Sequence, residues 1–220
     1  MSLEAIETAT GDDPVASVIV LHGLGADGRD FVPICGELDL ARVGSVRFVF
    51  PSAPVRPVTL NGGYEMRAWF DLLDTTFDKR EDEAGLRQAQ RLVEDLIARE
   101  RERGVPAERI VLMGFSQGCA MTLLVGLRHN TRLAGLAGLS GYLPLSDQTK
   151  AERSAANLEL PIFLAHGRED ALIPLASAVA SRDALQALGY PVEWHEYPMQ
   201  HSVCPQEVAD LNGWLLRVLG

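Results

Sequence analysis

Short apolar segments recur along the chain and are separated by segments with helical patterning. Runs rich in Val, Ile, Leu and Phe occupy residues 15–21, 46–50, 109–115, 133–139, 161–165 and 192–197. Several of these runs are apolar on both faces, which is typical of strands in a parallel sheet that helices cover on both sides. We therefore expect a sheet of buried strands.

The segments between these runs predict helices. The clearest apolar stripe extends from Leu86 to Ile97, and Gly104-Val105-Pro106 marks its end. Further helices are expected over residues 117–128, 175–188 and 205–219. Alternating strands and helices predict an α/β fold with a doubly wound, mostly parallel central sheet and helices on both faces. Residues 1–220 are expected to form a single domain, as is common for α/β folds of this length.

One connection differs from the others. Residues 51–83 contain Pro51, Pro54 and Pro57, two adjacent glycines and an aromatic group that includes Trp69, without clear periodicity. A connection of this length in a compact domain is usually functional.

Composition and charge narrow the classes of partner. The chain has 30 acidic and 20 basic residues, a formal net charge of -10, so no excess of positive charge is available for nucleic acid or an anionic bilayer. The acidic start lacks the features of a secretory signal, and no apolar stretch is long enough to span a membrane. We expect a cytoplasmic protein without integral membrane association.

The three cysteines, Cys35, Cys119 and Cys204, are far apart and form no C-x-x-C motif. This spacing offers neither a metal site nor a disulfide framework, and reduced, packed thiols are expected. We predict no metal and no cofactor.

The strongest motif is Gly114-Phe115-Ser116-Gln117-Gly118, between a buried strand and an apolar helix. The glycines permit a strained strand-to-helix turn that lifts the serine hydroxyl above the sheet, beside the positive end of the helix. We predict that Ser116 is a nucleophile.

A serine hydroxyl needs a base to take its proton, and the chain has five histidines. His129, at an expected helix end, is predicted to be solvated, and His195 falls within a strand. His22 and His166 each close a strand before a glycine, where an imidazole can brace the next loop, and a catalytic role for either stays open. His201 follows the last strand and completes the order Ser, Asp, His found in α/β-hydrolases, so we predict His201 as the base.

The acid and the oxyanion donors are expected at the same edge of the sheet. Asp170 follows the strand at 161–165 and is the predicted acid, with its neighbour Glu169 as the alternative. A tetrahedral oxyanion needs two N–H donors, and the backbone amides of Leu24 and Gln117 are the predicted pair.

A competing interpretation comes from Gly23-Leu24-Gly25-Ala26-Asp27-Gly28, which matches the G-x-G-x-x-G fingerprint of dinucleotide-binding oxidoreductases. That fingerprint expects an acidic residue about 20 positions further on to hold the ribose. No Asp or Glu occurs between Leu40 and Tyr64. A dinucleotide site would also leave Ser116, Asp170 and His201 without a role.

With these motifs the chain resembles the carboxylesterase and acyl-protein thioesterase family of α/β-hydrolases, most of all its bacterial carboxylesterase members, from about residue 15 to the last expected helix. The likeness rests on His22-Gly23-Leu24-Gly25-Ala26, on Asn61-Gly62-Gly63 followed by Met66-Arg67-Ala68-Trp69-Phe70-Asp71, on Gly114-Phe115-Ser116-Gln117-Gly118, on His166-Gly167 with Asp170, and on Tyr197-Pro198-Met199 with His201. One departure is Gln200, where the family often has glycine; a positive φ there would strain glutamine.

The resemblance implies an α/β-hydrolase fold without a large cap domain. It also implies a serine hydrolase that cleaves carboxylic esters, and optionally thioesters, through an acyl-enzyme. In it Ser116, Asp170 and His201 match the triad, and Leu24 and Gln117 match the oxyanion amides. Alternatives are acyl-protein thioesterase or lysophospholipase-like activity on longer acyl chains, and acyl transfer. The expected partners are a small ester or thioester or an acylated protein, and the family precedent is compatible with a homodimer.

Two further expectations concern the substrate and a different class of protein. Met66, Trp69, Leu172 and Val203 are apolar residues on loops predicted to face Ser116, so we hypothesise that they line an acyl pocket, with packing in the core as the equal alternative. A non-enzymatic binding protein of this fold would be expected to lack a triad residue, and a dienelactone-type hydrolase would have cysteine in place of Ser116.

Overall fold

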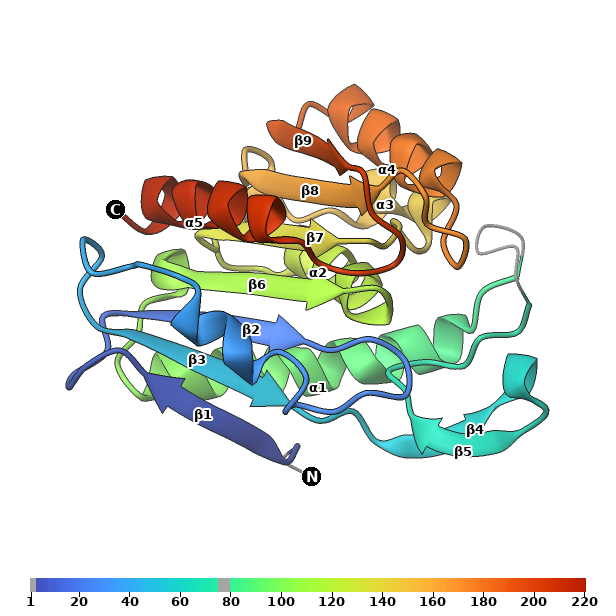
Figure 1. The fold of residues 1–220 in the computed structure, drawn as a ribbon, viewed down its shortest axis with the longest axis horizontal. Coiled ribbons are helices and arrows are strands. Elements are labelled where there is room, and N and C mark those ends of the chain that lie inside the picture. The colour runs from blue at the N-terminus through green and yellow to red at the C-terminus, as the bar shows by residue number, and fades with distance from the viewer. Residues whose placement is uncertain (1–2, 75–79) are drawn as a thin grey trace.

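The computed structural model describes residues 3–74 and 80–220, and its central feature is a seven-stranded sheet with the order β1-β3-β2-β6-β7-β8-β9 (Figure 1). The strands are β1 Ala5–Ala9, β2 Ala16–Leu21, β3 Val46–Pro51, β6 Ile110–Phe115, β7 Gly135–Leu139, β8 Ile162–Gly167 and β9 Val192–Tyr197. β1 pairs antiparallel with β3, and the other pairs of this sheet are parallel. The predicted sheet is confirmed, and the six expected strands begin and end within two residues of the observed bounds.

Helices cover both faces of the sheet (Figure 1). They are α1 Glu83–Glu102, α2 Gln117–Arg128, α3 Ser146–Glu152, α4 Leu175–Ala187 and α5 Pro205–Leu219. Successive residues of a strand point to opposite faces. Ile19 therefore packs in the core with Val93 of α1, whereas Val18 packs in the core with Trp214 of α5. α2 and α4 lie on the same face as α1.

Four of the strands and helices were not expected from the sequence. β1 is half exposed and has a glutamate at its centre, so it lacks the apolar run that marked the other strands. β4 Val55–Val58 and β5 Tyr64–Arg67 form a separate antiparallel hairpin within the long 51–83 connection, next to the main sheet in Figure 1. α3 is a seven-residue helix of mixed polarity. Residues 75–79 of the long connection lie outside the described part of the chain.

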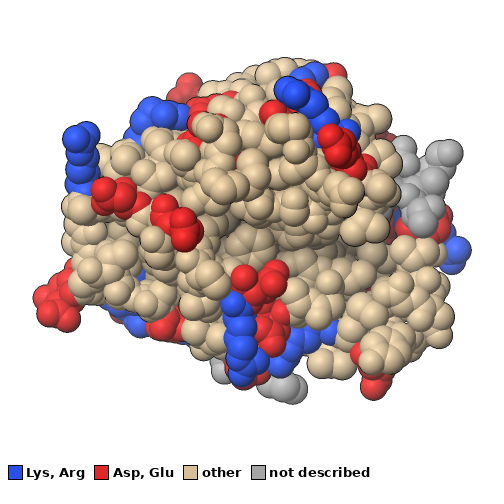
Figure 2. All heavy atoms as spheres, in the orientation of Figure 1, with Lys and Arg blue, Asp and Glu red and all other residues tan. Residues whose placement is uncertain are grey.

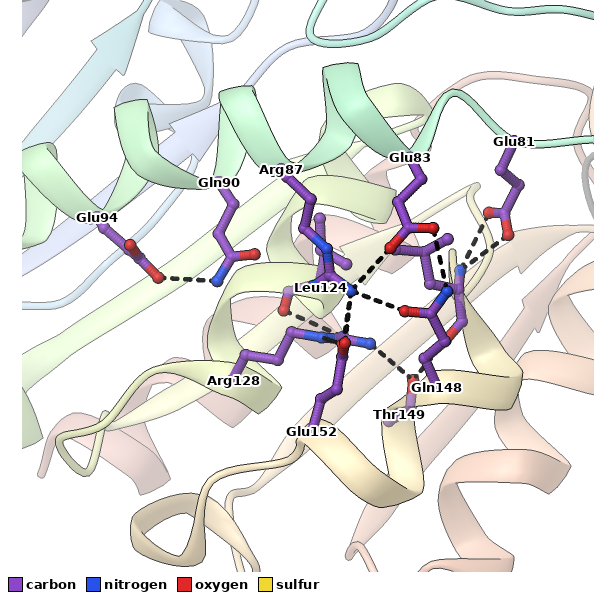
Figure 3. A network of polar contacts seen from close by, with 11 residues as sticks. Glu81, Glu83, Arg87, Gln90, Glu94, Leu124, Arg128, Gln148, Thr149 and Glu152 are labelled. Atoms are coloured by element: carbon purple, nitrogen blue, oxygen red, sulfur yellow. Dashed lines mark hydrogen bonds and ion pairs between the residues drawn. The ribbon is translucent and has the colours of Figure 1, made fainter.

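A polar network fastens α3 to its neighbours (Figure 3). Arg87 of α1 donates to Gln148 at 2.8 Å and to Glu152 at 2.6 Å. Arg128 of α2, with a side chain only 4% exposed, also donates to Glu152 at 2.6 Å. The carboxylate of Glu152, the last residue of α3, thus links α3 to both α1 and α2.

The first turn of α2 lies against the backbone of β2. A Cβ atom on Gly118 would stand 2.0 Å from the carbonyl oxygen of Leu21, closer than any real contact. Only glycine lets the helix start here, so this residue sets the distance between the helix and the sheet.

We expect Gly118→Ala to destabilise the fold by about 2 kcal/mol or more, because the added methyl group meets backbone that cannot rotate away. Gly213→Ala is the matched control, since it is also a helical glycine but its Cβ would have its nearest neighbour at 3.7 Å. The control should stabilise the protein by about 0.5–1 kcal/mol, the usual gain of alanine over glycine in a helix. Urea unfolding of both variants measures the difference. Equal stability of the two variants would contradict this account of Gly118.

Candidate active site

Ser116, Asp170 and His201 lie together at the carboxyl edge of the sheet, after β6, β8 and β9 respectively. Nε2 of His201 is 2.9 Å from Oγ of Ser116, and Nδ1 of His201 is 2.6 Å from Oδ2 of Asp170. The structure thus brings the three predicted residues into one hydrogen-bonded chain, although they are far apart in sequence.

The turn that carries Ser116 is strained. Ser116 has φ 56° and ψ −117°, although it is not a glycine. Its N–H donates to the carbonyl of Leu139 in β7 at 2.9 Å, which fixes the backbone of the turn. A Cβ on Gly114 would stand 2.2 Å from the carbonyl oxygen of Gly118, so both motif glycines are needed for the chain to double back. Such strain persists only where the surroundings hold it, and it clusters at functional sites.

Asp170 is held by three N–H groups. Its Oδ1 accepts from the backbone N–H groups of Leu172 and Ile173, both at 2.9 Å, and its Oδ2 accepts from His201. Asp170 is buried, whereas Glu169 is exposed. Geometry therefore pairs Asp170, and not its neighbour, with the imidazole.

His201 has one tautomer that suits both partners. A carboxylate only accepts, so Nδ1 carries the proton and donates to Asp170, which leaves the lone pair of Nε2 facing the hydroxyl of Ser116. The imidazole also packs against the ring of Phe115, with centroids 4.7 Å apart. Gln200, the residue before His201, does not adopt a positive φ, so glycine is not required there.

The other four histidines lie outside this chain of hydrogen bonds. His22 braces a loop: Nδ1 contacts the carbonyl of Gly23, Nε2 accepts from the N–H of Ala53, and burial lowers the pKa of the ring. His195 stacks on Phe163 within β9. The prediction that His129 is solvated is wrong, because this residue is only 8% exposed beneath the end of α2.

His166 is also a brace, and it lies next to the predicted acid. Its Nε2 is 2.8 Å from the carbonyl oxygen of Ile173 and 3.4 Å from Oδ2 of Asp170.

The side chain of Gln117 has a role that the sequence analysis missed. Its Oε1 accepts from the N–H of Trp69 at 2.8 Å, and its Nε2 donates to the carbonyl of Phe70 at 2.7 Å. Trp69 in turn donates its indole N–H to the carbonyl of His22 at 3.0 Å. The residue after the nucleophile is thereby tied to the loop that contains Leu24. An amide side chain at the start of an otherwise apolar helix was the only signal for this role.

The four residues hypothesised to line an acyl pocket fall into two groups. Leu172 is 68% exposed on the loop that follows Asp170, and Met66 and Val203 are partly exposed. Trp69, in contrast, has no exposed surface. For Trp69 the structure thus agrees with the alternative of packing in the core. Its indole braces the loop that begins at His22 and does not line an open pocket.

The glycines of the dinucleotide-like motif have a packing explanation. A Cβ on Gly28 would stand 2.3 Å from the carbonyl oxygen of Phe50 in β3. The N–H of Gly25 donates to the carbonyl of Arg67 at 2.9 Å, which fastens the loop to the β4–β5 hairpin. Close approach to the backbone thus accounts for glycine at position 28, and a φ of 77° accounts for glycine at position 25, without a phosphate.

Within residues 3–74 and 80–220, no group of three His, Cys, Asp or Glu side chains is arranged to hold a metal ion, and no helix is long and apolar enough to cross a membrane. The three cysteines are free thiols. Burial raises the pKa of the Cys119 thiol to about 12, so this neighbour of the serine turn is not a nucleophile at neutral pH.

Charge is unevenly spread over the face drawn in Figure 2. A hollow crosses the middle of this face, and most of the side chains around it are uncharged. Acidic and basic groups lie mainly around the margin, with one mixed group below the hollow (Figure 2). A surface of this kind suits an uncharged, apolar ligand better than a polyanion.

Comparison with known proteins identifies close relatives. A family model described as Phospholipase/Carboxylesterase matches residues 3–218. Acyl-protein thioesterase 1 of Yarrowia lipolytica is 40% identical over 205 residues, covering 91% of this chain and 90% of the relative. The crystal structure of Arabidopsis thaliana SOBER1 superposes with a TM-score of 0.88 at 30% identity, covering 93% of this chain and 99% of that one.

A second solved structure, Zea mays acyl-protein thioesterase 2, matches with a TM-score of 0.85 at 28% identity and covers 98% of this chain and 99% of that one. The α/β-hydrolase fold and the resemblance stated from the sequence motifs are confirmed. The relatives also support serine hydrolase activity on esters or thioesters. The chain belongs to the phospholipase/carboxylesterase family of α/β-hydrolases.

Proposed function

We propose that this protein is a carboxylesterase that hydrolyses acyl esters, and acyl thioesters of the same chain length, through an acyl-enzyme on Ser116. The observation that carries the proposal is the hydrogen-bonded chain from Ser116 through His201 to Asp170, with contacts of 2.9 and 2.6 Å. The strained backbone at Ser116 supports it, because strain of this kind clusters at functional sites.

In the proposed reaction Nε2 of His201 takes the proton of Ser116 as Oγ attacks the substrate carbonyl carbon. Collapse of the tetrahedral intermediate breaks the bond to the alcohol or thiol, which leaves with the proton from His201. Water then attacks the acyl-enzyme with His201 again acting as base, and the carboxylic acid is released. Asp170 holds the imidazole in the required tautomer and stabilises the imidazolium in both halves.

The oxyanion donors in this proposal are the backbone N–H groups of Leu24 and Gln117. Gln117 is the first residue of α2, where a helix has no internal acceptor for its N–H. On either side of Leu24 the loop is fixed, since Gly25 donates to Arg67 and Ala26 donates to Gly23. Among the described residues, the N–H of Leu24 has no acceptor, so it is available to a ligand. Each such donor is worth about 3 kcal/mol of barrier.

The acyl group is proposed to contact Leu172, Met66 and Val203. Leu172 has its N–H bonded to Asp170 and its side chain in solvent, beside the triad. Met66 lies in β5 near Gly25, whose added Cβ would stand 3.7 Å from the methionine sulfur. Val203 follows His201 by two residues and packs at the margin of the core. Partly or fully exposed apolar groups on one strand and two loops suit an acyl chain.

A second candidate is hydrolysis of long-chain thioesters on proteins, favoured because several of the curated relatives are named acyl-protein thioesterase 1. In both candidates the same triad acts, and only the preferred substrate differs. A cytoplasmic location is part of the proposal, and the free thiols of Cys35, Cys119 and Cys204 fit a reducing compartment.

The central test is a series of oxygen esters and thioesters from acetyl to palmitoyl, assayed with wild-type protein and with Ser116→Ala. Removal of the hydroxyl should reduce kcat by about a million-fold across the series, because no acyl-enzyme can form. The wild-type profile ranks the two candidate functions, and added alcohol acceptor reveals any acyl transfer. Full turnover by Ser116→Ala would exclude the proposed mechanism.

Asp170→Asn should lower kcat by about 10⁴-fold with little change in KM, since an amide in place of the carboxylate favours the wrong imidazole tautomer. Glu169→Gln is the matched control, because Glu169 is the adjacent carboxylate and is exposed. Its activity should stay within about twofold of wild type, as for most surface substitutions. Steady-state kinetics on one ester decide between the two carboxylates. A large loss in Glu169→Gln alone would reassign the acid.

Leu172→Ser should raise KM for long-chain substrates by about tenfold and leave acetyl esters little affected, since the leucine can contact only the longer chains. Leu158→Ser serves as control, because Leu158 is also an exposed leucine, at 40%, but it precedes β8 at the opposite end of the strand from the triad. The two profiles are compared by chain length. If both variants match wild type at every length, Leu172 does not contact the acyl chain.

A further inference from the structure

The carboxylate of Asp170 faces two imidazoles. Oδ2 is 2.6 Å from Nδ1 of His201 and 3.4 Å from Nε2 of His166. His166 has no exposed surface, whereas the side chain of His201 is 14% exposed. One acid with two imidazole neighbours could in principle stabilise a positive charge on either.

The tautomer of His166 follows from its partners. The carbonyl oxygen of Ile173, 2.8 Å from Nε2, can only accept, so Nε2 carries the proton. At 3.4 Å, the same N–H is too far from Asp170 for a full hydrogen bond. His166 therefore donates chiefly to the backbone of the loop that holds Asp170.

Nδ1 of His166 is buried and has no hydrogen-bond partner among the described residues. A second proton there would place a cation in an unsolvated position. Burial lowers the pKa of His166, against the opposing effects of the Ile173 carbonyl, of Asp170 and of Glu196 on β9, while His201 acts in the same direction as burial. The lowered pKa and the unpartnered Nδ1 both favour the neutral form of His166.

The contacts of His166 close a small loop around the acid. The chain leaves β8 after Gly167, and the carbonyl oxygen of Ile173 comes back to within 2.8 Å of His166 in that strand. Asp170 accepts from the N–H of Ile173, and His166 donates to the carbonyl of the same residue. Ile173 is thus fixed through both of its peptide groups, and the carboxylate is fixed with it.

We propose that His166 is a positioning residue for the hydrolase reaction. As a neutral donor it hydrogen-bonds to the carbonyl of Ile173, and it thereby holds the Asp170 carboxylate against Nδ1 of His201. This inference rests on the proposed function, since it assigns His166 a task only if Asp170 and His201 work on Ser116. In this role His166 supports the triad through the 168–173 segment and does not contact the substrate.

The test compares His166→Leu, which removes the donor, with His166→Gln, whose amide nitrogen can occupy the place of Nε2 and donate to Ile173. His166→Leu should lose about 10- to 100-fold in kcat, as found when a supporting hydrogen bond to a site residue is removed, with KM within about threefold. A loosened carboxylate stabilises the imidazolium less, so the acidic limb of the kcat/KM profile moves to lower pH. His166→Gln should recover most of kcat and return the limb toward its wild-type position.

His129→Leu is the matched control. His129 is also a buried imidazole with an unpartnered Nε2 among the described residues, but it caps the far end of α2. Replacing His129 should lower the midpoint of urea unfolding and leave the pH profile of kcat/KM unchanged. If His166→Leu behaves like this control, with unchanged kcat and an unmoved acidic limb, the positioning role is overturned. The same holds if His166→Gln is as impaired as His166→Leu.

These outcomes are separate from the fate of the proposed function. Wild-type kinetics in His166→Leu, together with an inactive Ser116→Ala, would reject only the role of His166. Full activity of Ser116→Ala would reject the hydrolase mechanism itself. Should His166→Leu not fold, His166→Met, which also lacks the donor, takes its place. A kcat reduced only in proportion to the unfolded protein, with an unmoved acidic limb, would then overturn the positioning role.

Discussion

The contact between the first turn of α2 and the end of β2 is the constraint on which the site depends. Gly118 brings helix backbone against the carbonyl of Leu21, and Gly114 lets the chain reverse with Gly118 directly above it. Ser116, between them, is left with φ 56° and an N–H bonded to Leu139. Because the backbone on either side of Ser116 is fixed, the Cα–Cβ bond of the serine has one direction, and His201 meets the hydroxyl above this turn.

Much of this arrangement was predictable from the sequence, for a physical reason. Strands buried on both faces must be largely apolar, so the central strands of the sheet were visible as apolar runs, such as Ile110–Phe115. The edge strand β9 is only partly buried and contains Glu193, His195 and Glu196. Parallel strands end at one edge, so residues directly after those runs had to be neighbours. Ser116, Asp170 and His201 could therefore be predicted as one site before any interatomic distance was known, and the structure places them in contact.

The parts that were not predictable depend on contacts between distant segments. β1 has no apolar run of its own, and it is a strand because β3 offers it an edge. Trp69 looked like a pocket residue because it lies in an irregular loop, but its indole finds the carbonyl of His22 and its backbone finds Gln117. His129 looked solvated beside polar neighbours, yet the packing of α1 and α2 covers it. Burial of a single side chain is a property of the assembled fold, which local sequence does not specify.

The histidines show most directly how structure resolves what residue type leaves open. His22 and His201 follow strands and His166 lies near the end of β8, all at the same edge of the sheet, so in the sequence only the order Ser, Asp, His favoured His201 as the base. Two of them have both ring nitrogens buried and the proton committed to a backbone carbonyl, whereas His201 keeps a lone pair facing a hydroxyl. His22 and His166 contact a backbone carbonyl and brace their loops, whereas His201 gives its Nδ1–H to a carboxylate and keeps Nε2 for the hydroxyl of Ser116. Asp170 therefore fixes the imidazole whose Nε2 faces Ser116, and the groups that hold Asp170 in place contribute to that geometry.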